Sequence, residues 1–329
     1  MIKKFFFIIC FVSLLSLSLK AESIINNSLN PINWEIKNEI IFDEFNGPKD
    51  KYFKNLFLQI ESYKGEGKRF TINEFKELLK RPESKKVYTK ELIRYATPES
   101  VKIQNKAHRD FSKIFMKEKR IRAGVDFLKK YDRLLSIAEK RYRTARQDIV
   151  SILMWESGLG TFTGNLRIFN VFMGQLLYLD IAQEYAVNKL LSQGKNNPLN
   201  SYEFAQKEKK RFEKIKKRAV RSLAALLRQS KVKNYDPLKV KGSWGGAIGY
   251  VQFMPYRMNF AVDGDNDGSI DLHSWPDAIL SVANYLKEFG DYNMSYKGRK
   301  RGIYSYNHSN SYVRGVILFA DTIWKAYRE

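Results

Sequence analysis

Residues 148–167, DIVSILMWESGLGTFTGNLR, hold the pattern that decides the fold. Residues three, four and seven positions apart share one face of a helix. Here that face joins three large apolar residues to one carboxylic acid: Ile149, Ile152, Leu153 and Glu156. Most side chains between them are also apolar, which predicts a helix that is buried nearly all round. Gly158 predicts its end, because glycine suits the left-handed position that caps many helices.

Glu156 is expected in the last turn of this buried helix. Burial disfavours the ionised carboxylate, and so does the negative end of the helix dipole. Both effects are expected to raise the pKa of Glu156 toward the range that a general acid needs near neutral pH. The competing interpretation is a structural acid paired with an arginine such as Arg167, because buried ion pairs also perturb pKa values.

The first residues predict export to the periplasm. Two lysines precede an apolar run over residues 5–19, and Leu19-Lys20-Ala21 resembles a signal-peptidase site, so residues 1–21 are interpreted as a secretory signal peptide. The run is shorter than the roughly 20 residues that a membrane-spanning helix needs. Cys10, the only cysteine, lies inside the run rather than at its end, so we expect neither lipidation nor disulfides.

The chain is strongly basic. Its formal net charge is +23, or about +20 without the three lysines of the leader. Such a surplus suggests a polyanionic partner. For an exported protein we expect the carboxylate-rich cell wall or an anionic membrane surface rather than nucleic acid. The alternative is that the lysines reflect a general compositional bias and lie on solvated helix faces without binding a partner.

The rest of the chain is helical in pattern, without strand-like alternation of any length and without internal repeats. Residues 22–46 are polar and rich in asparagine, which predicts a flexible or extended lead-in over residues 22–50. Apolar spacing by three and four predicts long helices over residues 121–143 and 202–229, and residues 170–191 form an apolar run with few breaks.

A glycine-rich stretch lies between Gly242 and Pro255. Four glycines in eight residues carry a large entropic cost unless something must approach the backbone closely. On a helix, Gly245 and Gly249 would open a groove on one face. Ser243 and Gln252 offer a hydroxyl and an amide, which suit sugar hydroxyl and acetamido groups. The alternative is a tight helix–helix crossing without a ligand.

An acidic loop follows at residues 263–277. Asp263, Asp265 and Asp267 stand at positions 1, 3 and 5, with glycine at 6, and Ser269 can offer its carbonyl at 7. This is the EF-hand calcium pattern. Position 12 is Ser274 instead of glutamate, so Asp277 is the candidate for the last ligand. A solvated acidic turn is the alternative.

The stretch between Tyr304 and Tyr312 carries aromatic and amide side chains. Aromatic rings stack on the apolar faces of sugars, and asparagine can both donate and accept hydrogen bonds. Alone, this stretch fits a surface turn with core tyrosines equally well.

Together the four stretches resemble the lytic murein transglycosylases of the B type, glycoside hydrolase family 103. The matching segments are Trp155-Glu-Ser-Gly-Leu-Gly, Gly242-Ser through Gly-Tyr-Val-Gln-Phe-Met-Pro255, the acidic loop and Tyr306-Asn307. Members of that family cut the β-1,4 bond between N-acetylmuramic acid and N-acetylglucosamine without water and leave a 1,6-anhydro end.

The resemblance implies site residues. Glu156 would be the sole catalytic acid and base. The glycan cleft would be lined by Ser243, Gln252, Tyr306, Asn307 and Tyr312. A structural Ca²⁺ would be held by Asp263, Asp265, Asp267, the Ser269 carbonyl and Asp277. Where the family usually carries a pair of arginines that are thought to meet the stem peptide, this chain reads Leu177-Tyr-Leu-Asp-Ile-Ala, so its peptide contacts are left open.

The resemblance also implies a mostly α fold with a lysozyme-like catalytic core over residues 105–329. Residues 51–104 would form an N-terminal helical region packed on that core, and the peptidoglycan glycan strand would be the partner of a monomer. Two other functions stay open: a muramidase-type hydrolase on the same scaffold, and a non-catalytic, calcium-stabilised wall-binding protein.

Overall fold

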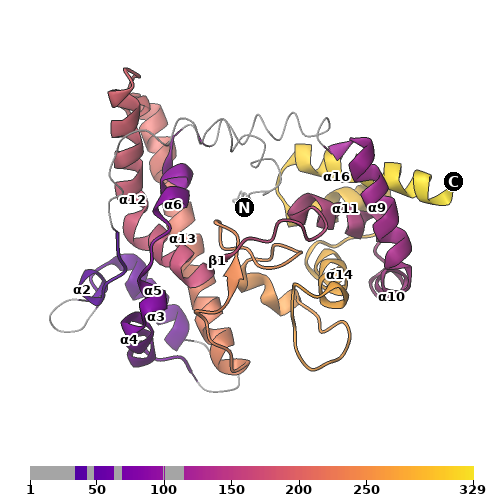
Figure 1. Ribbon diagram of the computed structural model, residues 1–329, viewed down its shortest axis with the longest axis horizontal. Coiled ribbons are helices and arrows are strands. Elements are labelled where there is room, and N and C mark those ends of the chain that lie inside the picture. Colours follow the sequence, from indigo (N-terminus) through magenta and orange to yellow (C-terminus); the bar gives the residue numbers. More distant parts are fainter. Residues whose placement is uncertain (1–33, 43–47, 63–68, 99, 101–114) are drawn as a thin grey trace.

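The computed structural model describes residues 34–42, 48–62, 69–98, 100 and 115–329. The predicted signal peptide lies outside these residues. The described chain is mostly helical, as predicted, and its helices form two groups on either side of a short two-stranded sheet (Figure 1). Across these residues, none of the helices has both the length and the apolar character needed to cross a membrane.

The first helical group begins with five short helices: α2 (Asn38–Ile41), α3 (Lys51–Glu61), α4 (Ile72–Lys80), α5 (Pro82–Lys85) and α6 (Thr89–Ala96). The apolar face of α3 is buried against α13 (Tyr202–Val232), as its spacing by three and four dictates. A capping box starts α4, in which Thr71 and Glu74 each bond the other's backbone nitrogen.

Residues 34–42, which belong to the lead-in expected for residues 22–50, are held against the rest of the described chain. The ring of Trp34 stacks on Tyr178 at 5.5 Å, and the Tyr178 hydroxyl donates a 2.5 Å hydrogen bond to the Glu35 carbonyl. Ile36 is fully buried, and its N–H donates to the Lys85 carbonyl. These contacts hold the segment on α12 (Ile168–Ser192), which carries Tyr178.

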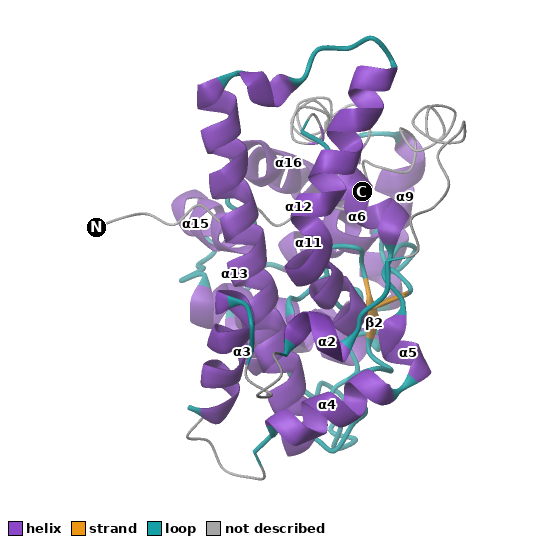
Figure 2. Cartoon of the chain, turned by 90° about the vertical axis from the view of Figure 1, so that its left-hand side faces the viewer, coloured by secondary structure: helices purple, strands orange, loops and turns teal. Residues whose placement is uncertain are grey.

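Two long helices complete the first group and form an antiparallel hairpin (Figure 2). They are α12 (Ile168–Ser192) and α13 (Tyr202–Val232), and the turn η1 (Pro198–Asn200) lies between them. Their apolar faces pack on each other, while α6 and α3 cover their sides. Lysines and arginines occupy much of the exposed face of α13, as expected for a solvated surface.

The second group surrounds a central helix, α11 (Arg146–Ser157). Its other members are α9 (Glu118–Lys130), α10 (Asp132–Tyr142), α14 (Trp275–Asn284), the π-helix η3 (Tyr285–Phe289), α15 (Tyr296–Tyr306) and α16 (Asn310–Arg328). Every residue of α11 from Asp148 onward is buried, as the sequence predicted. Helices α9, α10, α14 and α16 pack around it.

One predicted helix is divided. The pattern over residues 121–143 predicted a single helix, but α9 and α10 meet at Tyr131, whose backbone (φ −111°, ψ 23°) leaves the helical region. The Tyr131 ring lies against Phe127 and Trp275, at 4.5 and 5.6 Å. The ring of Tyr131 packs against other elements at the point where the helix breaks. Apolar spacing alone does not predict this break.

Strands β1 (Leu166–Arg167) and β2 (Lys241–Gly242) pair antiparallel and link the two helical groups. The segment after β2 is not helical, so the groove expected from a helical spacing of its glycines does not exist. Gly246 (φ +87°) and Gly249 (φ +70°) adopt left-handed backbone, which interrupts any helix. The chain instead turns back on itself through a bridge between Ile248 and Phe253 and enters η2 (Pro255–Phe260).

A buried ionic network fixes the start of α11. Asp148 is fully buried and accepts hydrogen bonds from two nitrogens of Arg299, at 2.7 and 2.8 Å, and from the Tyr292 hydroxyl at 2.6 Å. Arg299 also pairs with Asp321 at 2.7 Å. Asp148, at the opposite end of α11 from Glu156, therefore connects α11 to α15 and α16.

Candidate active site

Glu156 lies in the last turn of α11, with 0 % of its surface exposed. The Tyr312 hydroxyl, on α16, donates a 2.8 Å hydrogen bond to Glu156 Oε1. Arg167, considered above as an ion-pair partner, forms no ion pair with Glu156 in the described part of the chain. The Tyr312 hydroxyl can pair with either form of the carboxyl group, because a hydroxyl both donates and accepts hydrogen bonds.

Aromatic rings pack together at this end of α11. Trp155 stacks on Phe115 at 4.9 Å and meets the Tyr312 ring edge-on at 4.7 Å. The predicted end of the helix is confirmed, because Gly158 adopts the left-handed conformation (φ +59°) and its N–H donates to the carbonyls of Leu153 and Met154. The catalytic candidate is thus held in an apolar setting by a helix whose end is fixed.

The turn after α11 contacts an aromatic stack. Gly160 (φ +83°) lies against Trp275 and Tyr250, and a Cβ atom at this position would stand 3.0 Å from each of them. The two rings stack at 4.0 Å. Because Trp275 opens α14 at the C-terminal end of the acidic loop, the stack connects that loop to the turn that follows Glu156.

The predicted cleft residues Ser243 and Gln252 are buried and hold the glycine-rich segment. Ser243 Oγ accepts a 3.1 Å hydrogen bond from the Ala247 N–H. Gln252 Nε2 donates to the carbonyls of Gly249 at 2.8 Å and Thr163 at 3.2 Å, so it bonds this segment to the one that follows Glu156. Gln252 itself has φ +50°, a conformation that is uncommon outside glycine and that persists where the surroundings enforce it.

The other predicted cleft residues come from α15 and α16. The Tyr306 hydroxyl donates a 2.6 Å hydrogen bond to the Val251 carbonyl, next to Gln252. Asn307 is fully buried at the end of α15, and Tyr312 is the partner of Glu156. The structure thus ties Tyr306 to the glycine-rich segment and Tyr312 to Glu156.

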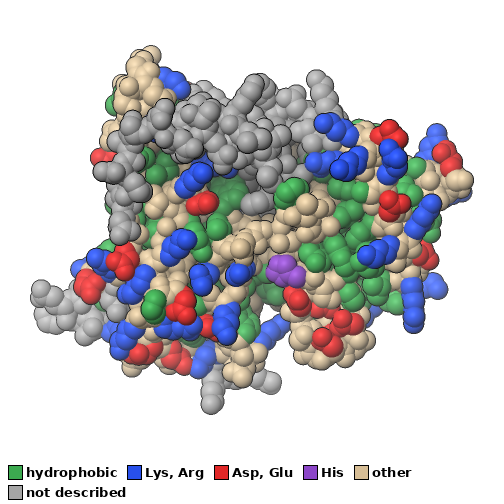
Figure 3. All heavy atoms as spheres, in the orientation of Figure 1, with side chains coloured by type: hydrophobic (Ala, Val, Ile, Leu, Met, Phe, Trp, Pro, Cys, Tyr) green, Lys and Arg blue, Asp and Glu red, His purple; other side chains and the backbone are tan. Residues whose placement is uncertain are grey.

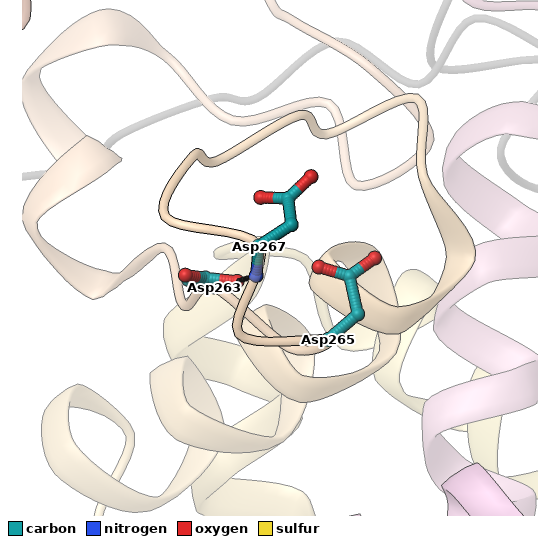
Figure 4. A group of neighbouring side chains, drawn as sticks. All are labelled: Asp263, Asp265 and Asp267. Atoms are coloured by element: carbon teal, nitrogen blue, oxygen red, sulfur yellow. Dashed lines mark hydrogen bonds between the residues drawn. The ribbon is translucent and has the colours of Figure 1, made fainter.

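In the acidic loop, Asp263, Asp265 and Asp267 offer carboxylate oxygens that all lie within 4.8 Å of one another (Figure 4). Asp263 accepts hydrogen bonds from the N–H groups of Asp267 and Gly268, and Asp267 accepts two from Ser269. This loop geometry and its oxygen-only donor set fit a Ca²⁺ ion.

Asp277 lies apart from these three carboxylates. It is buried in the first turn of α14, where its two oxygens accept hydrogen bonds from the N–H groups of Gly264 and Asp271, at 2.7 and 2.6 Å. Burial raises the pKa of Asp277, and the two N–H groups oppose that shift. In this arrangement it holds both ends of the loop, a role that the spacing of acids along the sequence does not reveal.

A pocket beside Ser243 was not anticipated. It lies between α6, α12 and the chain after β2, and its aromatic and amide lining includes Tyr88, Tyr95, Trp244 and Gln175. Gln175 is 1 % exposed, and neither end of its amide has a hydrogen-bond partner among the described residues. In the sequence, Trp244 could have indicated this pocket, because it lies inside the glycine-rich stretch. Gln175 could not, because it lies in an apolar run that does not suggest a site.

Charge is spread over the molecule. On the face drawn in Figure 3, lysine and arginine side chains lie over both helical groups, and hydrophobic side chains gather over the second group. This face therefore has no single basic patch that would indicate where a polyanion binds.

Comparison with known proteins places this geometry in a family. Residues 59–297 match the family model described as the transglycosylase SLT domain. The chain belongs to the transglycosylase SLT domain family. A curated relative, the membrane-bound lytic murein transglycosylase B of Escherichia coli (strain K12), is 30% identical over 182 residues. That match covers 55% of this chain and 41% of the relative, less than half of its length.

Solved structures share the fold of this SLT-family chain. The Escherichia coli lytic transglycosylase SLT35 in complex with calcium has a TM-score of 0.60 at 19% identity, over 89% of this chain and 100% of that chain. The catenated lytic transglycosylase SltB1 from Pseudomonas aeruginosa has a TM-score of 0.51 at 23% identity, over 66% and 82%. The predicted SLT-type helical fold is therefore confirmed.

Proposed function

We propose that this protein is a lytic transglycosylase of peptidoglycan. It cleaves the β-1,4 bond between N-acetylmuramic acid and N-acetylglucosamine and forms a 1,6-anhydromuramic end. The observation that carries the proposal is Glu156 itself: within an SLT-family fold, a wholly buried carboxyl group ends the central helix and is oriented by the Tyr312 hydroxyl. The family and the curated relative support the same reaction.

The mechanism uses one carboxyl group. Protonated Glu156 donates its proton to the oxygen of the leaving sugar as the glycosidic bond breaks. The substrate's acetamido oxygen stabilises the positive charge that develops at C1. The ionised Glu156 then takes the proton of the 6-hydroxyl group, whose oxygen attacks C1 and closes the anhydro ring.

A hydrolase of the usual kind needs a second carboxylate, as a nucleophile or as a base for water. The other acid of α11, Asp148, is held by Arg299 and Tyr292 and is not available for that role. This supports the transglycosylase over a muramidase-type hydrolase, and an intact Glu156 environment supports both over a non-catalytic wall-binding protein.

Ser243, Gln252, Tyr306, Asn307 and Tyr312 are proposed to form the glycan site. The hydrogen bonds that Ser243, Gln252 and Tyr306 make to backbone groups support a role in shaping its wall as well as in contacting sugars. Tyr312 orients Glu156 and is the member closest to the chemistry.

The deciding experiment is digestion of purified sacculi followed by mass spectrometry of the products. A transglycosylase releases muropeptides that are lighter by one water than those from a hydrolase. Products with reducing ends would support the muramidase, and intact sacculi would support the wall-binding protein.

A structural Ca²⁺ ion is proposed for the acidic loop. Asp263, Asp265, Asp267 and the Ser269 carbonyl would hold it, and the calcium complex of SLT35 supports the assignment. Asp277 would join as a ligand through a lone pair that its two backbone hydrogen bonds leave unused. The ion would stabilise the loop and take no part in the reaction.

The remaining assignments follow from this function. Residues 1–21 would direct export to the periplasm, where the glycan strand is the partner of a monomeric enzyme, and nucleic acid is not. Residues 51–104 would form the N-terminal region and residues 105–329 the catalytic domain. The basic surface would give weak association with the anionic wall or membrane.

A further inference from the structure

A buried arginine just beyond the glycine-rich segment has no anionic partner within the part of the chain that the structure describes. Arg257, on η2, is 6 % exposed, and no carboxylate of the described chain forms an ion pair with it. Its Nη1 atom is buried without a hydrogen-bond partner. Arginine is almost never buried unless it is paired, because desolvation of the charge is costly.

Aromatic rings surround the guanidinium group. Its central carbon lies 4.8 Å from the ring centroid of Tyr285, 5.7 Å from that of Phe289 and 6.0 Å from that of Tyr256. Rings attract a cation through their π faces, but they carry no net charge and do not neutralise it. The guanidinium group is thus held in place while its charge stays uncompensated.

This arginine adjoins the proposed glycan site. The Tyr285 ring that faces Arg257 also contacts the Tyr306 ring at 5.0 Å. His308 directly follows Asn307, and its Nδ1 atom is buried without a hydrogen-bond partner. Burial lowers the pKa of His308, and the charge of Arg257 lowers it further, so the two side chains lie in the same local field.

We infer that Arg257, with His308 beside it, binds a carboxylate group of the glycan substrate. The guanidinium fork matches a carboxylate in plane and can bond both of its oxygens. The inference rests on the proposed function, because peptidoglycan strands carry this group in two places: on the lactyl ether of N-acetylmuramic acid once its peptide is removed, and on the stem peptide.

The test measures binding in the Glu156→Gln background, where turnover does not interfere. Three preparations of glycan strands distinguish the sources: strands with stem peptides, strands freed of peptides by an amidase, and amidase-treated strands whose carboxylates have been converted to neutral methylamides. Loss of a hydrogen-bonded charge pair predicts that Arg257→Gln weakens binding by about 10- to 100-fold wherever the recognised carboxylate is present. Binding of the neutral strands should not change.

An effect on the amidase-treated strands alone assigns the lactyl group, and an effect on the peptide-bearing strands alone assigns the stem peptide. Arg221→Gln is the matched control, because it removes the same charge from an exposed arginine nearby. The guanidinium of Arg221 lies 4.2 Å from the ring centroid of Tyr256, which Arg257 also faces. Arg221→Gln should leave all three affinities within about twofold, as expected for an exposed charge.

The inference is overturned if Arg257→Gln weakens the neutral strands as much as the charged ones, or changes none of them. Thermal melts establish that each variant is folded. If Arg257→Gln does not fold, Arg257→Lys keeps the charge but loses the fork, and it should still weaken only carboxylate-dependent binding. Failure of the proposed function is separate: it would appear as absent anhydro products from the wild-type protein.

Discussion

Tyr312 and Glu156 are 156 positions apart in the sequence, yet a 2.8 Å hydrogen bond joins the hydroxyl of one to the carboxyl group of the other. The bond connects α16 to the end of α11. It gives the proton donor one fixed orientation within an apolar setting, and it can persist whether the carboxyl group is protonated or ionised, because a tyrosine hydroxyl both donates and accepts.

Tyr312→Phe should lower the turnover number about fivefold and lower the free energy of unfolding by only about 1 kcal/mol. The substitution removes one hydrogen bond, whose net contribution is about 1 kcal/mol, while the ring still packs edge-on against Trp155. Steady-state release of anhydromuropeptides and a thermal melt measure the two effects. Tyr327→Phe is the control, because Tyr327 lies on α16 like Tyr312 but its hydroxyl bonds Asp132 of α10. It should keep full activity. Equal loss in both variants would contradict an orienting role for Tyr312.

Glu156→Gln should lower the rate of strand cleavage by at least about 100-fold, since general acid–base catalysis contributes about 10²- to 10⁴-fold. The isosteric amide keeps the fold and the glycan site, so binding to sacculi should persist. Mass spectrometry of digests gives the rate and a pull-down gives the binding. Glu184→Gln, on the exposed side of α12, is the control. Substantial residual cleavage by Glu156→Gln would remove this residue from the mechanism.

Asp148→Asn should destabilise the protein by about 3–5 kcal/mol, because it leaves the buried guanidinium of Arg299 without its main partner. Denaturant unfolding monitored by circular dichroism measures the change. Asp321→Asn removes the second, half-exposed partner of the same arginine and should cost only about 0–1 kcal/mol. A similar small effect from both substitutions would mean that the buried pair does not anchor α11.

Chelation of calcium should lower the melting temperature. An ion that binds only the folded chain at about 100 times its Kd stabilises it by about 2.7 kcal/mol. Differential scanning fluorimetry with and without chelator measures this shift, and Asp265→Asn should reduce it because one of the three converging carboxylates is lost. Asp291→Asn, at an exposed acid elsewhere, should leave it intact. Superimposable melts of the wild-type protein with and without chelator would count against the site.

His308 should make the protein less stable in mild acid. Burial and Arg257 lower the pKa of His308 in the folded chain, whereas in the unfolded chain the imidazole takes up a proton near its ordinary pKa of about 6.5. The unfolded state therefore binds more protons as the pH falls below about 6.5, and the stability present above that pH is lost on the way down to the folded pKa. His308→Gln should flatten this part of the curve of melting temperature against pH. Parallel curves for the two proteins would refute the shift.

Much of the site was predictable where local pattern decides structure. The extent of burial along α11, the cap at Gly158 and the three clustered aspartates all follow from spacing and residue type. The break at Tyr131 did not follow, because a ring packed on Trp275 accompanies it. The packing of residues 34–42 was hidden for the same reason, since their burial depends on a distant helix.

The glycine-rich segment marks the limit of helical spacing as a guide. Glycines four apart would open a groove on a helix, but positive φ angles at Gly246 and Gly249 produce turns instead. One sequence cannot tell these two uses of glycine apart. Asp277 is a similar case, because its bonds to the N–H groups of Gly264 and Asp271 depend on how the loop folds back. Arg257 gave no signal at all: only the structure brings it beside His308.

The contact of Gly160 with the stacked rings of Trp275 and Tyr250 limits how this protein can vary over evolutionary time. Any side chain at position 160 would meet both rings at 3.0 Å and would also have to adopt a left-handed backbone. A change there is tolerable only together with a smaller residue at position 275 or 250, so descendants of this sequence are expected to keep the three residues or to exchange them in concert.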